Sequence, residues 1–391
     1  MYRRLLPLAV VTFAVGTDSL VIAGLLPAIA GDLRVSVSTA GQLVTVFALT
    51  YAFAAPVLAA VTGNLDRRTL LLTALGVFVA GNVLAASSGE FGLVMAARVI
   101  SALGSAVLTS VAMAAATVVA PAEQRGRALA LVTGGTTVAT TLGVPIGTLI
   151  GGADWRITMW SVAGLGTVAW ICLAVAMPKI ELSATRLRDR LAPLRDPGVL
   201  GILAVTFMIL TSGYILYTYI GPVMSGATGG AAWALTAILV AYGVGSILGN
   251  VVSGHVTDRF SPVRVLLVGL VVLVVTLAVT PLAGVSVPTA MLWATVWGVA
   301  GWLTGLPQQH RLVSRAPQSA PILLGLNVSV LQLGIATGGG IGGLLLQWET
   351  PALLGIVSAS VAAAALVFTL VTTRRIQAGE PEVAAADRPT R

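Results

Sequence analysis

The stretch VTFAVGTDSLVIAGLLPAIAGDL, residues 11–33, is apolar and long enough to cross a bilayer, yet it contains an ionisable side chain, Asp18. An acidic residue at the centre of a membrane costs about 2.5 to 3.5 kcal/mol on insertion scales, so such residues face a protein interior or a water-filled cavity and are functional by default. We therefore interpret Asp18 as a candidate proton carrier. The alternative is a structural carboxylate that caps a neighbouring helix.

The rest of the composition is typical of a membrane protein. The chain of 391 residues is 57% hydrophobic and 9% charged, and its mean hydropathy is +0.97, whereas a soluble domain is about 25% charged. Lipid offers the backbone no hydrogen-bond partners, so spanning segments are helices or closed barrels. The apolar runs are continuous over about 20 residues and do not alternate, which predicts an all-α integral membrane fold.

Charge and cysteine content exclude several function classes. The net charge of +8 is spread in pairs between apolar runs, so no basic face forms and we expect no nucleic-acid partner. Cys172 is the only cysteine, which excludes an internal disulfide and a cysteine metal cluster. His255 and His310 lie at loop edges, and no Ser/His/Asp set lies at membrane depth. We therefore expect neither an enzyme nor a metal site, and a channel is disfavoured because no selectivity-filter stretch interrupts the runs.

Twelve apolar runs predict twelve transmembrane helices. They span 5–30, 40–61, 69–88, 91–119, 126–150, 156–177, 198–222, 231–254, 263–283, 287–308, 318–346 and 351–373. Lys and Arg mark cytoplasmic loops. Nineteen of them lie at the termini and in the loops that follow even-numbered runs, whereas only Arg34 and Arg156 lie on the opposite side. We therefore expect both termini in the cytoplasm.

A charged loop divides the chain into halves. KIELSATRLRDRLAPLRDP, residues 179–197, separates six runs from six and reads as a solvated connector. The tail is rich in Ala, Glu and Pro, a composition typical of disorder. The predicted units are an N-terminal six-helix bundle 1–178, a cytoplasmic linker 179–197, a C-terminal six-helix bundle 198–375 and a disordered cytoplasmic tail 376–391.

The two halves resemble each other at an offset of 192 residues. A parallel repeat of six helices is the internal symmetry of one transporter class, whose substrate site lies between the halves near the bilayer midplane. The matching positions are Asp66-Arg67 with Asp258-Arg259, Gly147 with Gly339, and Gly151 with Gly343.

Four motifs point to one family. They are TGNLDRRTLLL (62–72) with its partner GHVTDRFSPVR (254–264), RVISALGSAV from Arg98, GGTTVATTLGVPIGTLIGG (134–152) and GTDSLVIAGLLP (16–27). With these motifs the chain resembles the major facilitator superfamily over about residues 5–375, in its twelve-helix drug/proton antiporter branch. Within that branch it is similar to the sugar, nucleoside and chloramphenicol-type exporters. The resemblance implies two pseudo-symmetric six-helix bundles.

The resemblance implies a cytoplasmic gate at the loop motif. In the family, the acid of this motif faces a helix N-terminus and has arginine partners; an exposed anion at that position contributes about 0.3 to 1 kcal/mol. The first copy has Thr62 where the family has Gly, so its arginines are alternatively only positive-inside anchors. The gate residues implied are Asp66, Arg67, Arg68, Asp258 and Arg259.

The resemblance also implies that Asp18 and Arg98 couple transport to protons. A guanidinium keeps its proton, so Arg98 would bias a nearby carboxylate towards ionisation. Alternatively, Arg98 lies near the outer interface and reaches the headgroups. In the sub-branch the acid often stands one residue later, at the position of Ser19, and this shift rotates a side chain by about 100° around a helix. Whether Asp18 faces the cavity therefore stays open.

The fifth apolar run resembles the antiporter motif of the branch. Small residues let helices approach closely, and a proline loosens the backbone hydrogen bonds so that a helix can bend. We predict a hinge here, with a plain packing face as the alternative. The residues are Gly135, Gly143, Pro145, Gly147 and Gly151.

Polar and aromatic residues inside the runs are candidates for a substrate cavity. Each is alternatively an ordinary packing or interface residue. The candidates are Tyr51, Tyr214, Tyr217, Trp297, Asn327 and Gln332.

These features together predict a proton-coupled exporter of small neutral or weakly polar organic compounds that works by alternating access. The alternative is an exporter of sugars, nucleosides or amino-acid-like metabolites with the same mechanism. We expect a monomer in the cell (inner) membrane, with protons as the coupling ion and no cofactor. The absence of other acids in the membrane core argues against a strongly cationic cargo.

Overall fold

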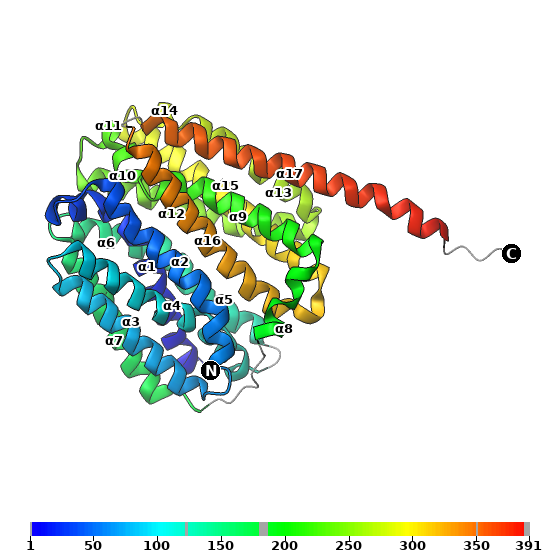
Figure 1. The fold of residues 1–391 in the computed structure, drawn as a ribbon, viewed down its shortest axis with the longest axis horizontal. Coiled ribbons are helices and arrows are strands. Elements are labelled where there is room, and N and C mark those ends of the chain that lie inside the picture. The colour runs from blue at the N-terminus through cyan, green and yellow to red at the C-terminus, as the bar shows by residue number, and fades with distance from the viewer. Residues whose placement is uncertain (1, 122–123, 180–186, 349–350, 387–391) are drawn as a thin grey trace.

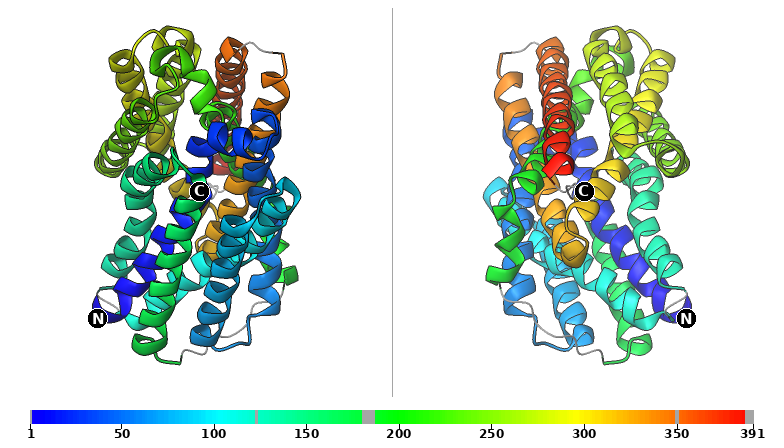
Figure 2. Two further views of the ribbon diagram at one scale, coloured as in Figure 1. Left: turned by 90° about the vertical axis from the view of Figure 1, so that its left-hand side faces the viewer. Right: turned by 90° about the vertical axis from the view of Figure 1, so that its right-hand side faces the viewer.

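The computed structural model describes residues 2–121, 124–179, 187–348 and 351–386. Within these residues, ten helices are long and apolar enough to cross a membrane. A shorter apolar helix, α13 (Pro262–Ala278), and the long helix α15 (Val287–Arg315) complete the twelve segments that the sequence predicted. The all-α membrane fold is thus confirmed, and Figures 1 and 2 show the helices of the two halves in two groups.

The first half contains six membrane-crossing segments, and the fifth of them is interrupted by a π-helix. Pairing of α3 with α4 and of α1 with the fifth segment dominates its packing. The elements are α1 (Tyr2–Asp32), α2 (Val37–Val61), α3 (Arg67–Ser87), α4 (Phe91–Val119), α5 (Arg125–Val138), the π-helix (Ala139–Gly143), α6 (Val144–Gly151) and α7 (Trp155–Ala176).

The described part of the linker contains α8 (Leu187–Leu191) and a 3-10 turn (Ala192–Arg195), whereas residues 180–186 of the predicted linker lie outside the described residues. The second half then repeats six long segments. Its elements are α9 (Pro197–Tyr217), α10 (Ile220–Val223), α11 (Ser225–Thr228), α12 (Ala232–Arg259), α13, α14 (Thr280–Ala283), α15, a 3-10 turn (Pro317–Ser319), α16 (Ala320–Leu346) and α17 (Pro351–Ala386).

Two predicted runs of the second half break near their ends. The run 198–222 is helical as α9 up to Tyr217, and the run 263–283 is helical as α13 up to Ala278. Proline has no N–H group, so Pro222 cannot donate to the carbonyl of Thr218, and Pro281 cannot donate to the carbonyl of Leu277. Short separate helices, α10 and α14, follow these breaks.

Short polar side chains start several of the long helices. Ser36 accepts from the Thr39 N–H at 3.0 Å and begins α2, and Asp154 accepts from the Arg156 N–H at 2.9 Å and begins α7. Each such cap satisfies an N–H group that the helix leaves unpaired and contributes about 1 kcal/mol. Because the cap pairs these N–H groups locally, the helix can begin directly after a short loop.

The halves pack against each other most closely at one end of the molecule. We call the end that holds Arg67, Arg68 and Arg315 the basic end, and the end that holds Asp32 and Arg156 the far end. Residues of both halves share one buried apolar cluster near the far end, which includes Leu25 and Ile220, whereas a second cluster belongs to the first half alone.

Direct contacts between the halves close the far end. The Ser38 hydroxyl of α2 donates to the Gly343 carbonyl of α16 at 2.7 Å, and a Cβ atom at Gly221 would lie 3.2 Å from the Pro27 ring. Nearer the basic end, α2 exposes 64% of Phe53 and 75% of Val61. The halves therefore meet at the far end and separate towards the basic end.

The C-terminal segment differs from the sequence-based expectation. The sequence predicted disorder from residue 376, but α17 continues as a helix to Ala386, and Figure 1 shows this end projecting away from the bundle. Four Ala and two Glu residues between 376 and 386 favour a helix, whereas Gly379 and Pro381 disfavour it. Residues 387–391 of the predicted tail lie outside the described residues.

Candidate functional site

Asp18 and Arg98 form an ion pair inside the first half. Arg98 Nη1 donates to Asp18 Oδ1 at 2.6 Å, and Nη2 donates to the Asp18 backbone carbonyl at 3.2 Å. The Asp18 side chain is 0% exposed and that of Arg98 is 1% exposed. Asp18 lies near the middle of α1 and Arg98 lies two turns into α4, so two membrane-crossing helices bring both charges together at depth.

Two further helices enclose the pair. The ring centroid of Phe47, on α2, lies 4.2 Å from Arg98 Cζ, an arrangement that favours a cation over an aromatic face. Asn82, on α3, lies beside Asp18 and donates to the Phe78 carbonyl at 3.0 Å. In the described part of the chain, Asp18 Oδ2, Arg98 Nε and Asn82 Oδ1 have no hydrogen-bond partner. The site thus holds polar atoms that the protein does not satisfy.

The structure shows how Asp18 is oriented. Its carboxylate faces α4, whereas Ser19, where the exporter sub-branch often has its acid, is partly exposed. Asp18 does not cap a helix, and Arg98 does not reach the surface, so neither structural alternative matches this geometry. A proton can reach the carboxylate when the ion pair separates or when water reaches Oδ2.

The fifth segment loosens directly before its proline. Pro145 has no N–H group to donate to the carbonyl of Thr141, and Val144 donates instead to Ala139, five residues earlier, which is the π-helix pattern. The single Thr141 hydroxyl lies 3.0 Å from the Thr137 carbonyl of its own helix and 3.3 Å from the Gly243 carbonyl of the second half, so it can donate to either. The irregular backbone therefore lies where the fifth segment touches α12. The hinge stays a prediction, but its backbone basis is present.

The glycines of the same motif pack closely on α1. A Cβ atom at Gly147 would lie 2.6 Å from Val21 Cγ2, and one at Gly151 would lie 2.6 Å from Leu25 Cδ2. Gly135 and Gly143 face α1 in the same way, against Thr12 and Thr17. The packing interpretation thus fits these glycines, while the loosened backbone belongs to Pro145.

The matching glycines of the second half lie against the other half as well as against the end of α9 and Tyr219 of their own half. A Cβ atom at Gly339 would lie 2.9 Å from Thr45 Oγ1, and one at Gly343 would lie 3.3 Å from Gln42 Nε2. Tyr219 also donates to the Gly339 carbonyl at 2.9 Å. The repeat therefore uses one glycine pattern for packing within the first half and for closure between the halves at the far end.

The first copy of the gate motif makes several hydrogen bonds within the first half. Asp66 Oδ2 accepts from the Thr69 N–H and hydroxyl, both at 3.0 Å, and so caps its own helix, α3. Arg67 donates to the Gly63 carbonyl at 3.0 Å, and Arg68 donates to the Ala174 carbonyl at 2.5 Å. Asp66 thus faces a helix N-terminus, as the motif implies.

The second copy of the gate motif lies at the end of α12. Asp258 and Arg259 are both exposed there, and among the described residues no ion pair joins either of them to another side chain. The role of these residues as a gate therefore stays a prediction.

An aromatic cluster occupies the second half. It consists of Tyr214 and Tyr217 of α9, Tyr242 of α12, and Trp293 and Trp297 of α15. Ring centroids lie 5.3 Å apart for Tyr217 and Tyr242, 5.0 Å for Tyr242 and Trp297, and 4.9 Å for Trp293 and Trp297. Trp293 Nε1 donates to the Thr276 carbonyl at 2.7 Å, which fixes one edge of the cluster.

Sequence reasoning found three of these five aromatic residues. It missed Tyr242 and Trp293, although the four-residue spacing of Trp293 and Trp297 places them on one helix face and was a usable signal. Phe47 and Asn82 were missed as well, because nothing in the sequence indicates which side chains of α2 and α3 would meet Arg98.

The other cavity candidates lie on α2 and α16, which are not the helices that carry the aromatic cluster. Tyr51 is 4% exposed and packs on Phe47, with centroids 6.4 Å apart, so it belongs to the surroundings of Arg98. Asn327 and Gln332 lie on α16, are 4% and 7% exposed, and each has an unpaired amide oxygen among the described residues.

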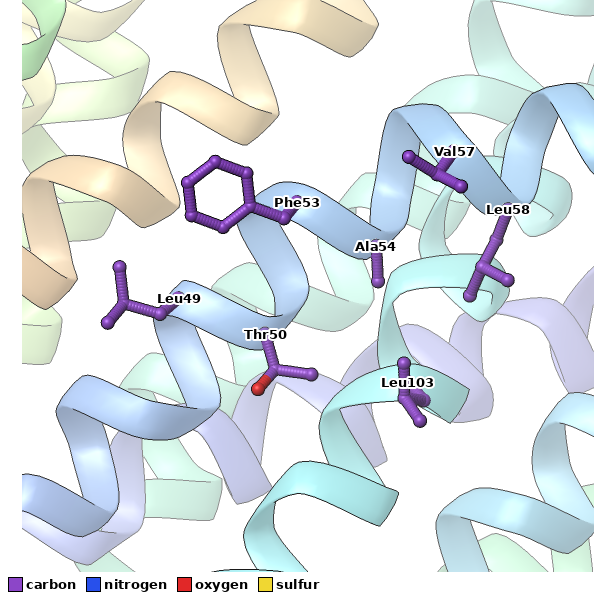
Figure 3. A pocket seen from close by; sticks show the side chains of 7 residues that line it. All are labelled: Leu49, Thr50, Phe53, Ala54, Val57, Leu58 and Leu103. Carbon is purple, nitrogen blue, oxygen red and sulfur yellow. The ribbon is translucent and has the colours of Figure 1, made fainter.

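A shallow apolar groove marks the outer face of α2 and α4. Figure 3 shows Thr50, Ala54 and Leu103 lining it. Thr50 provides its only hydroxyl, and the groove contains none of the residues above. Phe53, whose 64% exposure marks the separation of the halves, also lines it, so we assign the groove no separate role. The remaining lining residues are Leu49, Phe53, Val57 and Leu58.

Two halves of six membrane-crossing helices, with a buried ion pair in one and an aromatic cluster in the other, define a membrane transporter. The family model of the Major Facilitator Superfamily matches residues 8–319. The chain therefore belongs to this superfamily, whose members are transporters and not enzymes.

Sequence relatives and a solved structure agree with this family. The chain is 35% identical over 342 residues to the uncharacterized MFS-type transporter YbcL of Bacillus subtilis, covering 87% of this chain and 88% of the relative. It is 30% identical over 375 residues to the inner membrane transport protein YdhP of Escherichia coli K12, covering 95% and 96%. A bacterial homolog of the human lysosomal transporter Spinster, solved in an inward-facing and occupied conformation, is similar with a TM-score of 0.76 at 17% identity, covering 95% and 96%. At this low identity, the structural similarity supports the fold alone.

Proposed function

We propose that the chain is a proton-coupled exporter of small neutral or weakly polar organic compounds. The observation that carries the proposal is the Asp18–Arg98 ion pair, buried at membrane depth. Replacing a buried ion pair by apolar residues is often neutral or stabilising, so stability alone does not account for charges at this expensive position. A group that binds and releases a proton does account for them.

The ion pair provides a simple coupling step. Protonation of Asp18 removes the negative charge beside Arg98 and leaves a buried cation without its partner, a state that costs several kcal/mol. Rearrangement of α1 against α4 relieves this cost by giving the guanidinium new partners. The driving force is of the same order as this cost, because one charge crossing 100 mV supplies about 2.3 kcal/mol and a pH gradient adds to it.

The aromatic cluster provides a surface for the cargo. Its five side chains carry no charge, and aromatic rings with polar tips suit compounds that are apolar over most of their surface. Tyr242 lies next to Gly243, which contacts the π-helix of the first half. A compound bound at the cluster would therefore lie beside the fifth segment, whose loosened backbone can transmit the change between the halves.

The same proposal includes the inner membrane, cytoplasmic termini and outward transport. Nineteen of the Lys and Arg residues lie at the basic end or in its predicted loops, and a relative from E. coli is named an inner membrane transport protein. With the basic end in the cytoplasm, the closed far end and the exposed side chains of α2 at the basic end correspond to an inward-facing state. The proposed mechanism needs one copy of the chain and no cofactor besides the proton.

Transport by the purified protein in liposomes tests the proposal. A panel of drugs, nucleosides, sugars and amino acids is offered with and without an imposed pH gradient. We expect uphill movement of at least one neutral or weakly polar drug, driven by the gradient and abolished by a protonophore. Movement of metabolites alone would favour the alternative cargo, and transport that ignores the gradient would contradict proton coupling.

A further inference from the structure

A line of hydroxyls leads from the ion pair along α4. Ser105 and Thr109 follow Arg98 by 7 and 11 residues, so at about 100° per residue both lie within about 20° of it around the helix. Ser101 lies one turn from Arg98. Ser101 and Ser105 are 1% and 0% exposed, whereas Thr109 is partly exposed. Because α4 runs from the far end to the basic end, the line begins at the ion pair and reaches the surface towards the basic end.

Each hydroxyl oxygen of this line can accept a hydrogen bond in addition to the one that the hydroxyl donates. Ser101 Oγ donates to the Arg98 carbonyl at 3.2 Å, Ser105 Oγ to the Ser101 carbonyl at 2.9 Å, and Thr109 Oγ1 to the Ser105 carbonyl at 3.3 Å. A hydroxyl that donates once keeps lone pairs that can accept. Residues one turn apart on a helix are about 5 to 6 Å from each other, a spacing that one water molecule can bridge.

The inner end of the line contains unsatisfied polar atoms. Asp18 Oδ2, Arg98 Nε and Asn82 Oδ1 have no hydrogen-bond partner among the described residues, and their side chains are at most 1% exposed. A buried polar group without a partner costs about 1 to 3 kcal/mol, and water is the usual partner of such groups. The Asn82 side chain lies beside Asp18, and a water molecule beside the carboxylate would satisfy the atoms that remain.

The outer end of the line is defined by Tyr51. Its side chain is 4% exposed, and its hydroxyl lies near Thr109. The other α4 residues that pack on Tyr51 and Phe47 are Ala102 and Ala106. The hydroxyls are therefore the polar atoms that this face of α4 offers between the ion pair and the surface.

We propose that Ser105 and Thr109 carry the proton between the basic end and Asp18, through a chain of hydroxyls and water molecules. In each step an oxygen accepts a proton on one side and releases its own on the other, so every hydroxyl ends unchanged and Asp18 Oδ2 gains one O–H bond. Tyr51 flanks the outer entry of the route. This inference rests on the proposed function, in which Asp18 is the coupling group.

A pH step applied to the detergent-solubilised full chain tests the route without a substrate. Proton uptake after a downward step is followed by stopped flow with a pH-indicator dye, and subtraction of the Asp18→Asn trace isolates the part due to Asp18. Ser105→Ala and Thr109→Val remove one hydroxyl each with little change in volume. Thr109→Ser keeps the hydroxyl that Thr109→Val removes and is the conservative variant. Ser110→Ala is the matched control, because Ser110 is exposed on another face of α4 and makes the same kind of bond, to the Ala106 carbonyl at 3.2 Å.

If the route is correct, the variants change the rate of proton uptake but not the number of protons taken up. We expect the Asp18-dependent uptake to keep its amplitude but to slow about tenfold in Ser105→Ala and in Thr109→Val, the effect of about one lost hydrogen bond in the transfer barrier. Thr109→Ser and Ser110→Ala should match the wild type.

Two outcomes would contradict the hydroxyl route, and a third would contradict the proposed function. Unchanged rates in both Ser105→Ala and Thr109→Val would exclude the hydroxyl route, as would equal slowing in Ser110→Ala. A wild-type trace with no Asp18-dependent uptake would contradict the proposed function itself. If one variant also loses amplitude because its fold is disturbed, the other variant decides on the route.

Discussion

The two halves share one arrangement of helices but carry different chemistry at equivalent positions. In the first half Asp18 and Arg98 form a buried ion pair. At the offset of 192 residues their counterparts are Leu210 and Ala290, which cannot pair. Conversely, two positions that carry serine hydroxyls of the line in the first half carry tryptophans of the aromatic cluster in the second half. These matching positions are Ser101 with Trp293 and Ser105 with Trp297.

This difference indicates how one scaffold can serve two tasks. A repeat keeps the helix directions and the packing, so a symmetric change of shape remains available to both halves. The side chains are then free to diverge, with proton chemistry in one half and cargo contacts in the other.

Removal of the carboxylate should abolish coupling. Asp18→Asn keeps the side-chain volume but cannot change charge, so we expect gradient-driven transport to fall to background while exchange of substrate at equal concentrations persists. The control is Leu210→Asn, which places the same side chain at the equivalent position of the second half. Gradient-driven transport by Asp18→Asn at the wild-type rate would break the division.

Removal of the cation should be the most destabilising single change. Arg98→Leu leaves the Asp18 carboxylate buried without a partner, and breaking a buried pair costs about 3 to 5 kcal/mol. The double variant Asp18→Leu/Arg98→Leu should regain most of that stability but not transport. Denaturant unfolding in detergent measures both; if the double variant is as unstable as Arg98→Leu, the pair is primarily structural.

The aromatic cluster should govern affinity and leave coupling intact. Trp297→Phe removes ring area and the indole N–H from a contact surface, so we expect substrate binding to weaken about tenfold, the effect of about 1.4 kcal/mol. Trp160→Phe is the control, because Trp160 lies on α7 and is 49% exposed. An equal loss in both variants would show that the effect is general and not due to the cluster.

The π-helix should affect turnover more than binding. Pro145→Ala supplies the missing N–H, which can restore regular hydrogen bonds over 139–143 and stiffen the segment between the halves. We expect turnover to fall several-fold with nearly unchanged substrate affinity in the liposome assay. Equal loss of turnover and affinity would point to disturbed packing on α1.

The smallest effect belongs to an ion pair at the basic end of the second half. The Asp196 carboxylate accepts from Arg315 Nε at 2.9 Å and from the Gly198 N–H at 2.7 Å. The Arg315 hydrogen bond, with help from Gly198, holds the pKa of Asp196 below its usual value. Such a depressed pKa contributes stability above the unfolded value of about 3.9, and the contribution is lost as the pH falls through the folded pKa.

Asp196→Asn therefore lowers stability at neutral pH only slightly, within the roughly 0 to 1 kcal/mol of exposed pairs. The difference from the wild type should vanish in acid. Unfolding curves at neutral and acidic pH measure it. A difference that persists at acidic pH would assign the effect to the helix cap and not to the charge.

The sequence predicted the fold well because hydrophobic length and charge asymmetry act locally. The twelve runs became the twelve segments, and the glycine motif and Pro145 indicated the irregular fifth segment. The partnership of Asp18 and Arg98 was also predicted, but through resemblance. The surroundings of the pair were not predictable, because Phe47 and Asn82 meet it only through the rotation of α2 and α3, which depends on packing across the bundle.

The most direct test of the division between the halves counts protons and measures affinity in one experiment. Calorimetric titration of a substrate from the liposome panel, in two buffers of different ionisation enthalpy, gives the number of protons released on binding for the wild type, Asp18→Asn and Trp297→Phe. We predict release by the wild type, none by Asp18→Asn, and unchanged release at weaker affinity by Trp297→Phe. Undiminished release by Asp18→Asn would contradict the account.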